Sequence, residues 1–526
     1  MADTLRSFNA SGHALGHKII MATLKKKQIH ILIVIALMIL VVTLLYPIGN
    51  KLLLSVRGQS YSSSNSSHIY SYSLPKKLVI ENTSALPTTE AVPILTYHGV
   101  IADGEIATNT GRKTFISQME MLKQKGYETI SVKEYDLFRD GKFRLPKKPI
   151  IITFDDGRKD SFYTVDEILE KLGFKATIFL ATIKANKNDP FYLSWDELVK
   201  VQATGRWEIE AHGRRSHDEI QIDEKGTLER QYLISRIYTP GKGLESVEEY
   251  KKRVEADYVN GIADIKEHLG IDARYFAVPL GDYGSLEVYN YKDAYEFNQE
   301  LTRRFFKFAF IQAYHWKSFY NYRDSNPYIL NRLGVRNMSS DDLLKELERF
   351  AAKPKNLAFS KTEGLESFLQ DAQLLYGNME TNGGITLLSI ASTPPARILF
   401  GDRGWKNYSI KIRMVREKGR SAVVIVYYAD EDNFISLNWS KKILQLTERA
   451  DGKERELASY YPWEKEGEVE VLVRVRDGYV SAYFSGIVLA QGLPIKLSRG
   501  TAGFGVWDPK GAQSTIRKLE IVSLDK

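Results

Sequence analysis

Two adjacent carboxylates and a pair of histidines stand out as residues whose types and spacing could do chemistry together. Asp155 and Asp156 follow the strand-like run Ile150–Thr153, and His212 and His217 follow the strand-like run "WEIEA". In an open parallel sheet, functional groups collect at the carboxyl ends of the strands. Two imidazoles and one carboxylate meeting there would leave positions open for water and substrate, which is the ligand set of a hydrolytic zinc site.

The acidic pair suggests a division of labour. Two like charges at the end of a buried strand are costly unless a positive charge lies between them, and a divalent cation would relieve at least one of them. Neighbouring side chains at one strand end do not easily point at the same ion. We therefore expect one aspartate to bind the cation and the other to take a proton from a water on it, because bound zinc lowers the pKa of that water to about 7.

Each of these signals has an ordinary structural explanation. "DDG" is common in turns, where aspartate caps a helix and glycine takes a positive φ, and a histidine pair beside arginines is also typical of a surface loop. The combination is the stronger evidence for a functional site: a strand ends in Asp-Asp-Gly, and a histidine pair follows a later strand of the same sheet. Together they favour a metal site.

The elements that must position these residues are visible around them. From Val92 to Lys353, strand-like and helix-like runs alternate with short links, among them "KPIIITFDDG", "DSFYTVDEILEKLGF", "KATIFLAT" and "SWDELVKVQATG". This alternation predicts an α/β domain with a parallel sheet covered by helices. The strand-like "RYFAV" then places Pro279 to Tyr283 at a third strand end.

The remainder of the chain after "KPKN" has a different rhythm. Short runs such as "YSIKIRMV", "SAVVIVYYA" and "EVEVLVRVRDGYVSAYFSG" alternate apolar and polar residues between turns, which predicts an all-β sandwich or jelly roll. Trp405, Trp439, Trp463 and Trp507 are candidates for stacking on sugar rings, although tryptophans in such domains more often belong to the core.

The N-terminal region predicts attachment to a membrane. The segment 29–50 carries no charge and has about the 20 residues that a spanning helix needs, and Lys25, Lys26 and Lys27 precede it. By the positive-inside tendency the N-terminus stays in the cytoplasm and the rest lies outside it. A cleaved signal peptide is the competing interpretation, but the basic region is long and no small-residue cleavage pattern follows.

Composition excludes several classes of site. The 526 residues contain no cysteine, which removes disulfides, iron–sulfur clusters and thiolate zinc sites. The formal charge of +8 is scattered, and no nucleic-acid-binding motif accompanies it. No Gly-x-Gly-x-x-Gly opens the α/β region, which disfavours a dinucleotide-dependent dehydrogenase. Apart from the metal ligands, we expect no cofactor-binding residues.

The run Thr153-Phe154-Asp155-Asp156-Gly157 resembles the first motif of the polysaccharide deacetylases, the NodB-like carbohydrate esterases. The resemblance covers roughly Val92 to Phe350 and implies a distorted (β/α) barrel. It implies Asp155 as catalytic base, and Asp156, His212 and His217 as metal ligands. The four residues between the histidines, the opening "PILTYHGV" and the long insert before "RYFAVPLG" are similar to the poly-N-acetylglucosamine deacetylases of exopolysaccharide.

Two family features depart from the usual pattern. The third motif is commonly Arg-x-Pro-Tyr, in which the arginine holds the base, but here it is Ala277-Val278-Pro279-Leu280, and Arg274 lies three residues earlier. Leu280 still offers a backbone N–H to an oxyanion. The late Leu-x-x-His motif is not evident, so His98, at the end of the first strand, is the preferred general acid and His315 the second candidate. For either histidine, a structural role in the core is the alternative.

These observations predict a membrane-anchored, zinc-dependent polysaccharide N-deacetylase with an accessory jelly-roll sandwich, whose catalytic domain faces outside the cytoplasm. The expected organisation is a basic cytoplasmic segment (1–28), an anchor (29–50), a Ser-rich linker (51–90), the deacetylase domain (91–353) and the β domain (356–526). The expected partners are an N-acetylglucosamine polysaccharide and the membrane, without nucleic acid. Peptidoglycan or another acylated glycan is an alternative substrate, and a catalytically silent glycan-binding protein is the alternative of a different class.

Overall fold

The structure is a computed structural model. It describes residues 72–75, 78–83, 89–101, 109–185, 189–284, 289–313, 318–336, 338–350, 372–381, 384–389, 395–401, 403–440, 442–461 and 467–524. The expected basic segment, the membrane helix over 29–50, most of the linker, the domain boundary near 353–356 and His315 lie outside these residues. Within the described ranges, no helix combines the length and the apolar composition needed to cross a bilayer.

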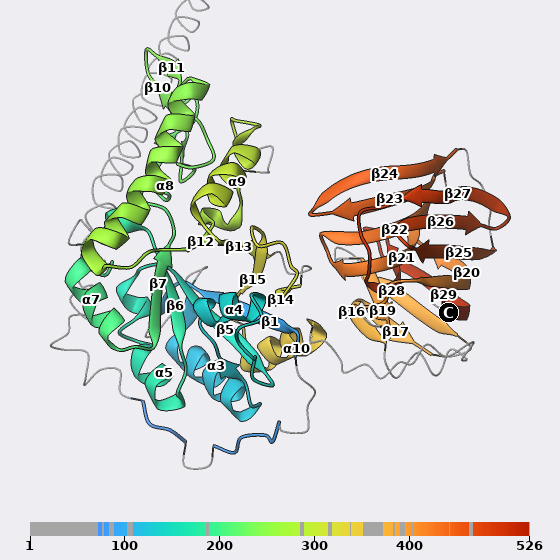
Figure 1. Cartoon of the computed structure of the whole chain (residues 1–526), viewed down its shortest axis with the longest axis horizontal. Coiled ribbons are helices and arrows are strands. Elements are labelled where there is room, and N and C mark those ends of the chain that lie inside the picture. The colour runs from blue at the N-terminus through green and yellow to red at the C-terminus, as the bar shows by residue number, and fades with distance from the viewer. Residues whose placement is uncertain are drawn as a thin grey trace, which may run out of the picture. The chain divides into compact units, whose positions relative to one another are not determined.

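Seven parallel strands of the α/β domain close into a barrel, which confirms the expected (β/α) barrel. Their order is β1-β15-β13-β12-β7-β6-β5, and pairing of β5 with β1 closes the ring (Figure 1). Two further strands pair with strands of the ring without belonging to it. β14 is antiparallel to β1, and β4 is parallel to β5. The bounds are β1 (Ala91–Tyr97), β4 (Glu128–Thr129), β5 (Pro149–Asp156), β6 (Ala176–Leu180), β7 (Trp207–Ala211), β12 (Tyr275–Ala277), β13 (Phe308–Ala313), β14 (Tyr320–Tyr322) and β15 (Leu330–Gly334).

Helices cover the outside of the barrel, with α3, α5, α7 and α8 lying around the strands in Figure 1. Three of the helices begin with a capping box, in which a serine and the glutamate three residues later satisfy each other's backbone N–H. For α8 these are Ser246 and Glu249, and Gly270 ends the helix with φ 71°. The helices are α3 (Arg112–Gln124), α4 (Val132–Arg139), α5 (Asp166–Leu172), α6 (Thr182–Ala185), α7 (Trp195–Ala203), α8 (Val247–Leu269), α9 (Ala294–Phe305) and α10 (Ser340–Phe350), with 3₁₀ turns η1 (Lys159–Ser161) and η2 (Pro279–Gly281).

Alternation along the strands separates two apolar cores. In β5, Ile150 and Ile152 belong to the core between barrel and helices, whereas Ile151 belongs to the core inside the barrel. Asp155 has the same phase as Ile151, so it points toward the inside, at the carboxyl end of its strand. The inner core also includes Val92, Ile94, Phe179, Tyr275, Phe308, Phe310 and Leu330.

Short strand pairs decorate the barrel. Two of them form hairpins in the expected insert between the histidine pair and α8, and a third pair follows β1. They are β2 (Val100–Ile101) with β3 (Thr110–Gly111), β8 (Ile220–Gln221) with β9 (Leu228–Glu229), and β10 (Tyr238–Thr239) with β11 (Gly243–Leu244).

The C-terminal region is the expected β sandwich, with two antiparallel sheets of seven strands each (Figure 1). One sheet has the order β16-β19-β28-β21-β22-β23-β24 and the other β17-β18-β29-β20-β25-β26-β27. The bounds are β16 (Gln373–Tyr376), β17 (Asn378–Glu380), β18 (Ile385–Ser389), β19 (Ala396–Phe400), β20 (Tyr408–Lys418), β21 (Ser421–Asp430), β22 (Asn433–Ser440), β23 (Leu444–Ala450), β24 (Lys453–Tyr460), β25 (Glu468–Arg476), β26 (Tyr479–Phe484), β27 (Ile487–Pro494), β28 (Thr501–Trp507) and β29 (Ala512–Ser523).

The tryptophans of the sandwich divide between core and surface. Trp405 and Trp439 are buried among the apolar residues of both sheets, so neither is available to stack on a sugar. Trp507 is 38% exposed at the end of β28, and Trp463 lies outside the described residues. The sugar-stacking hypothesis is therefore wrong for the first two and stays open for Trp507.

Candidate metal and catalytic site

Asp156, His212 and His217 come together at the carboxyl ends of β5 and β7. His217 Nε2 lies 3.3 Å from Asp156 Oδ1, His212 Nε2 lies 3.7 Å from the same oxygen, and the two Nε2 atoms are 3.0 Å apart. Bonds of about 2.1 Å to a tetrahedral zinc would place neighbouring ligand atoms about 3.4 Å apart. The observed separations bracket that value, so these three residues fit a tetrahedral metal site with one position left for another ligand.

The backbone at Asp156 is held in an unusual conformation. Asp156 has φ 75° and Gly157 has φ 73°, so two successive residues adopt the left-handed region as the chain leaves β5. This conformation is unfavourable for a residue with a Cβ. Strain of this kind persists where the surrounding structure imposes it, commonly at functional sites. Asp155 points into the barrel, so regular alternation would direct Asp156 to the other face of the strand. The left-handed backbone instead turns the Asp156 carboxylate toward the histidines.

A hydrogen bond to His212 and the burial of His217 both favour these rings as metal ligands. His212 Nδ1 lies 2.8 Å from the carbonyl oxygen of Ala277. A carbonyl only accepts hydrogen bonds, so Nδ1 carries the proton and Nε2 directs a lone pair toward Asp156 and His217. Burial lowers the pKa of His217 to about 4, against the opposing effect of the Asp156 carboxylate. The His217 ring can therefore offer an unprotonated nitrogen at neutral pH, and the Ala277 contact orients His212 Nε2 toward the same point.

The loop between the histidines is fixed from α8. The buried carboxylate of Asp257 accepts hydrogen bonds from the backbone N–H groups of Arg214 (2.8 Å) and Arg215 (2.7 Å). Ser216 Oγ donates to the carbonyl oxygen of His212 at 2.6 Å. These bonds explain how four intervening residues can return the second imidazole to the first.

Asp155 is held by an arginine from another strand. Arg332 on β15 donates from Nη1 to Oδ1 at 2.7 Å and from Nη2 to Oδ2 at 2.8 Å, and both side chains are almost completely buried. Burial acts to raise the pKa of Asp155, but the guanidinium and the nearby imidazoles outweigh it and hold that pKa well below its usual range. Asp155 is therefore an ionised, rigidly oriented carboxylate beside the three metal-binding candidates.

This arginine is the functional residue that sequence reasoning missed. Arg274, three residues before Ala277, precedes β12 and so lies at the opposite end of that strand from the site. The strand Leu330–Gly334 was not identified from the sequence, so its inward-facing arginine was missed as well. The available signal was the position of Arg332, which alternates in phase with Leu330 and Gly334 and so lies on the same face of the strand.

The site lies in a pocket of about 180 Å³. His98, the expected general acid, lines this pocket beyond the end of β1, and its carbonyl oxygen accepts a hydrogen bond from Ser161 Oγ. Leu280 also lines it with a left-handed backbone (φ 61°) and a side chain that is 48% exposed. The complete lining is Thr96, His98, Asp155, His212, His217, Leu280, Gly281, Gln312, Gly334, Val335 and Arg336.

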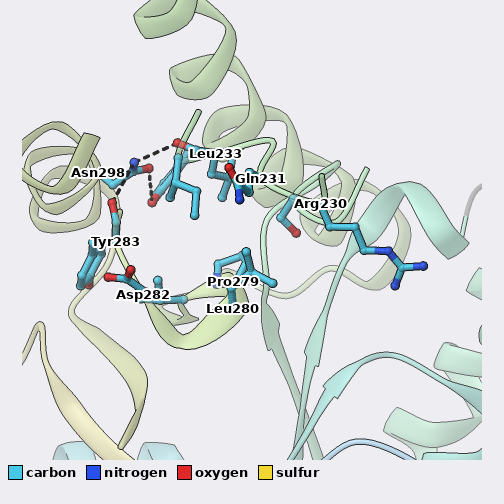
Figure 2. Close-up of a pocket in the computed structure, with 12 residues that line it drawn as sticks. Arg230, Gln231, Leu233, Pro279, Leu280, Asp282, Tyr283 and Asn298 are labelled. Atoms are coloured by element: carbon cyan, nitrogen blue, oxygen red, sulfur yellow. Dashed lines mark hydrogen bonds between the residues drawn. The ribbon is translucent and has the colours of Figure 1, made fainter. Parts of the chain in front are cut away.

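A second cavity lies beside Leu280 and is much smaller. Its volume of about 10 Å³ has room for roughly one water molecule. In Figure 2, Asn298 closes one side of it through hydrogen bonds to the carbonyl oxygens of Leu233 and Tyr283, while Pro279 and Leu280 form another side. A sugar unit does not fit there, whereas the larger pocket contains Asp155 and both histidines and is therefore the candidate substrate site.

Residues 142–294 match the protein-family model described as polysaccharide deacetylase. The matched segment includes Asp155, Asp156, His212 and His217, the residues on which the sequence resemblance rests.

Parts of the chain are similar in sequence to proteins that are named as deacetylases. The poly-beta-1,6-N-acetyl-D-glucosamine N-deacetylase of Escherichia coli K12 is 24% identical over 187 residues, covering 32% of this chain and 27% of its own. The enzyme of the same name from Staphylococcus aureus MRSA252 is 29% identical over 161 residues, covering 27% of this chain and 53% of its own. A solved de-N-acetylase structure from Aggregatibacter actinomycetemcomitans is 19% identical, covers 49% of this chain and 100% of its own, and gives a TM-score of 0.42. The chain thus spans between about a quarter and about half of the length of these two curated relatives.

Proposed function

We propose that this chain is a metal-dependent N-deacetylase that removes acetyl groups from an N-acetylglucosamine polysaccharide of the cell envelope. One observation carries the proposal: the Asp156–His212–His217 cluster lies beside the arginine-bound Asp155, and Asp155 and both histidines line a single pocket. The names of the relatives support the substrate class.

Asp156, His212 and His217 would hold the cation, and zinc is the ion that we propose for this set of nitrogen and oxygen ligands. When bound, a divalent cation supplies a Lewis acid that polarises the acyl carbonyl and acidifies a water molecule. Asp155 would accept the proton of the attacking water at a carboxylate oxygen. A carboxylate paired this tightly with Arg332 is a weak base, so its contribution lies in fixed position more than in basicity.

Two further groups complete the proposed reaction. The backbone N–H of Leu280 would donate to the acyl oxygen as negative charge develops on it, and the left-handed turn fixes that donor at the pocket wall. His98, which also lines the pocket, would protonate the departing amine. The products are acetate and a glucosamine unit. We also propose that the domain works outside the cytoplasm, tethered by residues 29–50.

The competing hypothesis of a catalytically silent glycan-binding protein rested partly on the absent motif arginine. Arg332 supplies the missing contact to the base, so this argument against catalysis no longer applies.

Metal-loaded protein incubated with β-1,6-linked N-acetylglucosamine oligomers tests the proposal. We expect release of acetate together with free amines, lost on chelation and restored by added zinc. Chitin oligomers and peptidoglycan fragments, assayed in parallel, report the linkage preference. Bound metal without acetate release from any of these glycans would reject the proposed activity.

A further inference from the structure

The catalytic pocket contains two hydrogen-bonding side chains that the proposed chemistry does not use. Thr96 on β1 is 1% exposed, and its Oγ1 has no hydrogen-bond partner in the part of the chain that the structure describes. Gln312 on β13 is half-buried, and none of the hydrogen bonds found among the described residues involves its amide. Buried polar groups in proteins are nearly always paired, so an orphan hydroxyl in a pocket wall calls for an explanation.

Two of the charged or ionisable side chains of the pocket are already engaged. Asp155 is paired with Arg332, and His212 Nδ1 with the carbonyl oxygen of Ala277. The backbone around Thr96 is engaged as well, since its carbonyl oxygen accepts from Val335 N at 2.9 Å. Only its hydroxyl is left. Thr96 and Gln312 thus offer a neutral hydroxyl and a neutral amide, which match the donors and acceptors of sugar hydroxyl groups.

Two glycines make room for the Gln312 side chain. A Cβ on Gly281 would lie 2.6 Å from Gln312 Cβ, and a Cβ on Gly334 would overlap Gln312 Nε2. Gly281 needs its positive φ of 71° for the turn, but Gly334 lies in β15 with ordinary strand geometry, where glycine weakens a strand. The backbone does not require glycine at 334; the space for the amide does.

Thr96 and Gly334 are also direct partners in the register of β1 and β15. The unpaired hydroxyl on β1 and the amide on β13 therefore lie on the two strands that flank β15, and both line the same pocket. We propose that Thr96 and Gln312 form a subsite for a hydroxyl group of the sugar unit whose acetamide is cleaved. This inference rests on the proposed deacetylase function and deepens it by naming what recognises the sugar ring.

Gln312→Leu and Thr96→Val remove the polar groups at nearly constant volume, and Gly334→Ala displaces the amide without removing it. We compare kcat/KM on N-acetylglucosamine oligomers with kcat/KM on 4-nitrophenyl acetate, an acetyl ester without sugar hydroxyls. We expect the ratio of the two to fall about tenfold in each variant, the effect of one lost hydrogen bond. Thr96→Ser should restore the ratio, and Gln202→Leu, on the surface of α7, is the matched glutamine control. Metal content and thermal unfolding verify that each variant is folded and loaded.

Oligomers lacking the 3- or the 4-hydroxyl of the reacting unit identify the contact, because O6 of an internal β-1,6-linked unit lies in the glycosidic bond. One of these deletions should slow the wild type about tenfold and have little further effect in Gln312→Leu. If every deletion is equally costly in both proteins, or if the variants slow both substrates alike, the subsite is rejected and the two groups bind only water. If the wild type cleaves the ester but no oligomer, the deacetylase proposal itself fails and the subsite fails with it.

Discussion

At the scale of single residues, Asp155 and Asp156 are neighbours with different partners. Asp156 turns to the two histidines through a strained backbone, and Asp155 stays in the phase of its strand and meets Arg332. We expect Asp155→Asn to reduce deacetylation by about 10²- to 10⁴-fold, the usual contribution of a general base. Metal content should stay that of the wild type, because Asp155 is not among the clustered ligand atoms. Elemental analysis of the variant checks this, and loss of metal would contradict the separation of roles.

The histidines should show the opposite behaviour. His212→Ala or His217→Ala removes one of three protein ligands, so bound metal and deacetylation should be lost together. His268→Ala is the matched control, since that ring stacks on Trp195 and takes no part in the site. Retention of stoichiometric metal by both site variants would show that the ion is held elsewhere.

Arg332 is expected to affect both activity and stability. Removing one member of a buried ion pair leaves the other charge uncompensated, so Arg332→Met should lower the free energy of unfolding by about 3–5 kcal/mol. Arg332→Lys keeps the charge but not the two-pronged contact, and we expect it to fold while kcat falls. Urea unfolding and steady-state kinetics measure the two effects. An Arg332→Lys enzyme with full kcat would show that orientation of Asp155 is unimportant.

At the scale of elements, strand ends and helix α8 together build the metal site. β5 and β7 deliver the ligands, and Asp257 of α8 fixes the backbone between the histidines. Most of these elements were predictable, because apolar alternation and capping residues act over short stretches of chain. β15 was not, because "ILNRLGV" is short and its arginine interrupts the apolar pattern. That strand brings Arg332, and Gly334 with it.

Asp257 also predicts a pH dependence of stability. Burial raises its pKa to about 6, although the N–H groups of Arg214 and Arg215 and the charge of Arg253 act to lower it. Because the folded-state pKa exceeds the ordinary aspartate pKa of 3.8, the stabilisation is fully present below about pH 4 and is lost as pH rises through 6. The difference of about two pKa units corresponds to about 3 kcal/mol. Asp257→Asn should remove this contribution.

Urea unfolding of wild type and Asp257→Asn at several pH values between 4 and 7 provides the test. The wild type should lose stability relative to the variant across that window, since the variant has no proton to release there. Parallel curves for the two proteins would mean that Asp257 does not titrate in it.

At the scale of the whole molecule, we expect bound metal to stabilise the barrel domain and not the sandwich. The metal-ligand candidates all lie in the barrel domain, and the sandwich has an apolar core between its own two sheets. A ligand that binds only the folded state at 100 times its Kd stabilises that state by about 2.7 kcal/mol. For a domain of this size we expect zinc to raise the unfolding temperature of the barrel by about 5–10 °C.

Calorimetry of the full chain with zinc and with chelator measures this shift. The transition that responds should become unresponsive in His212→Ala, and the sandwich should unfold at the same temperature in both conditions. A shift that survives in the histidine variant would place the stabilising metal outside the proposed site.

The sequence by itself determined the elements and the residue types of the site. Strand and helix periodicity, capping residues and the Thr-Phe-Asp-Asp-Gly run depend on near neighbours along the chain, so they can be recognised without a fold. Only the tertiary structure decided which groups meet. Arg332 reaches Asp155 across 177 residues because the barrel closes, and Gln312 and Thr96 share one pocket wall because β13, β15 and β1 lie in sequence around it. Such contacts follow from strand order and register, which local propensities do not encode.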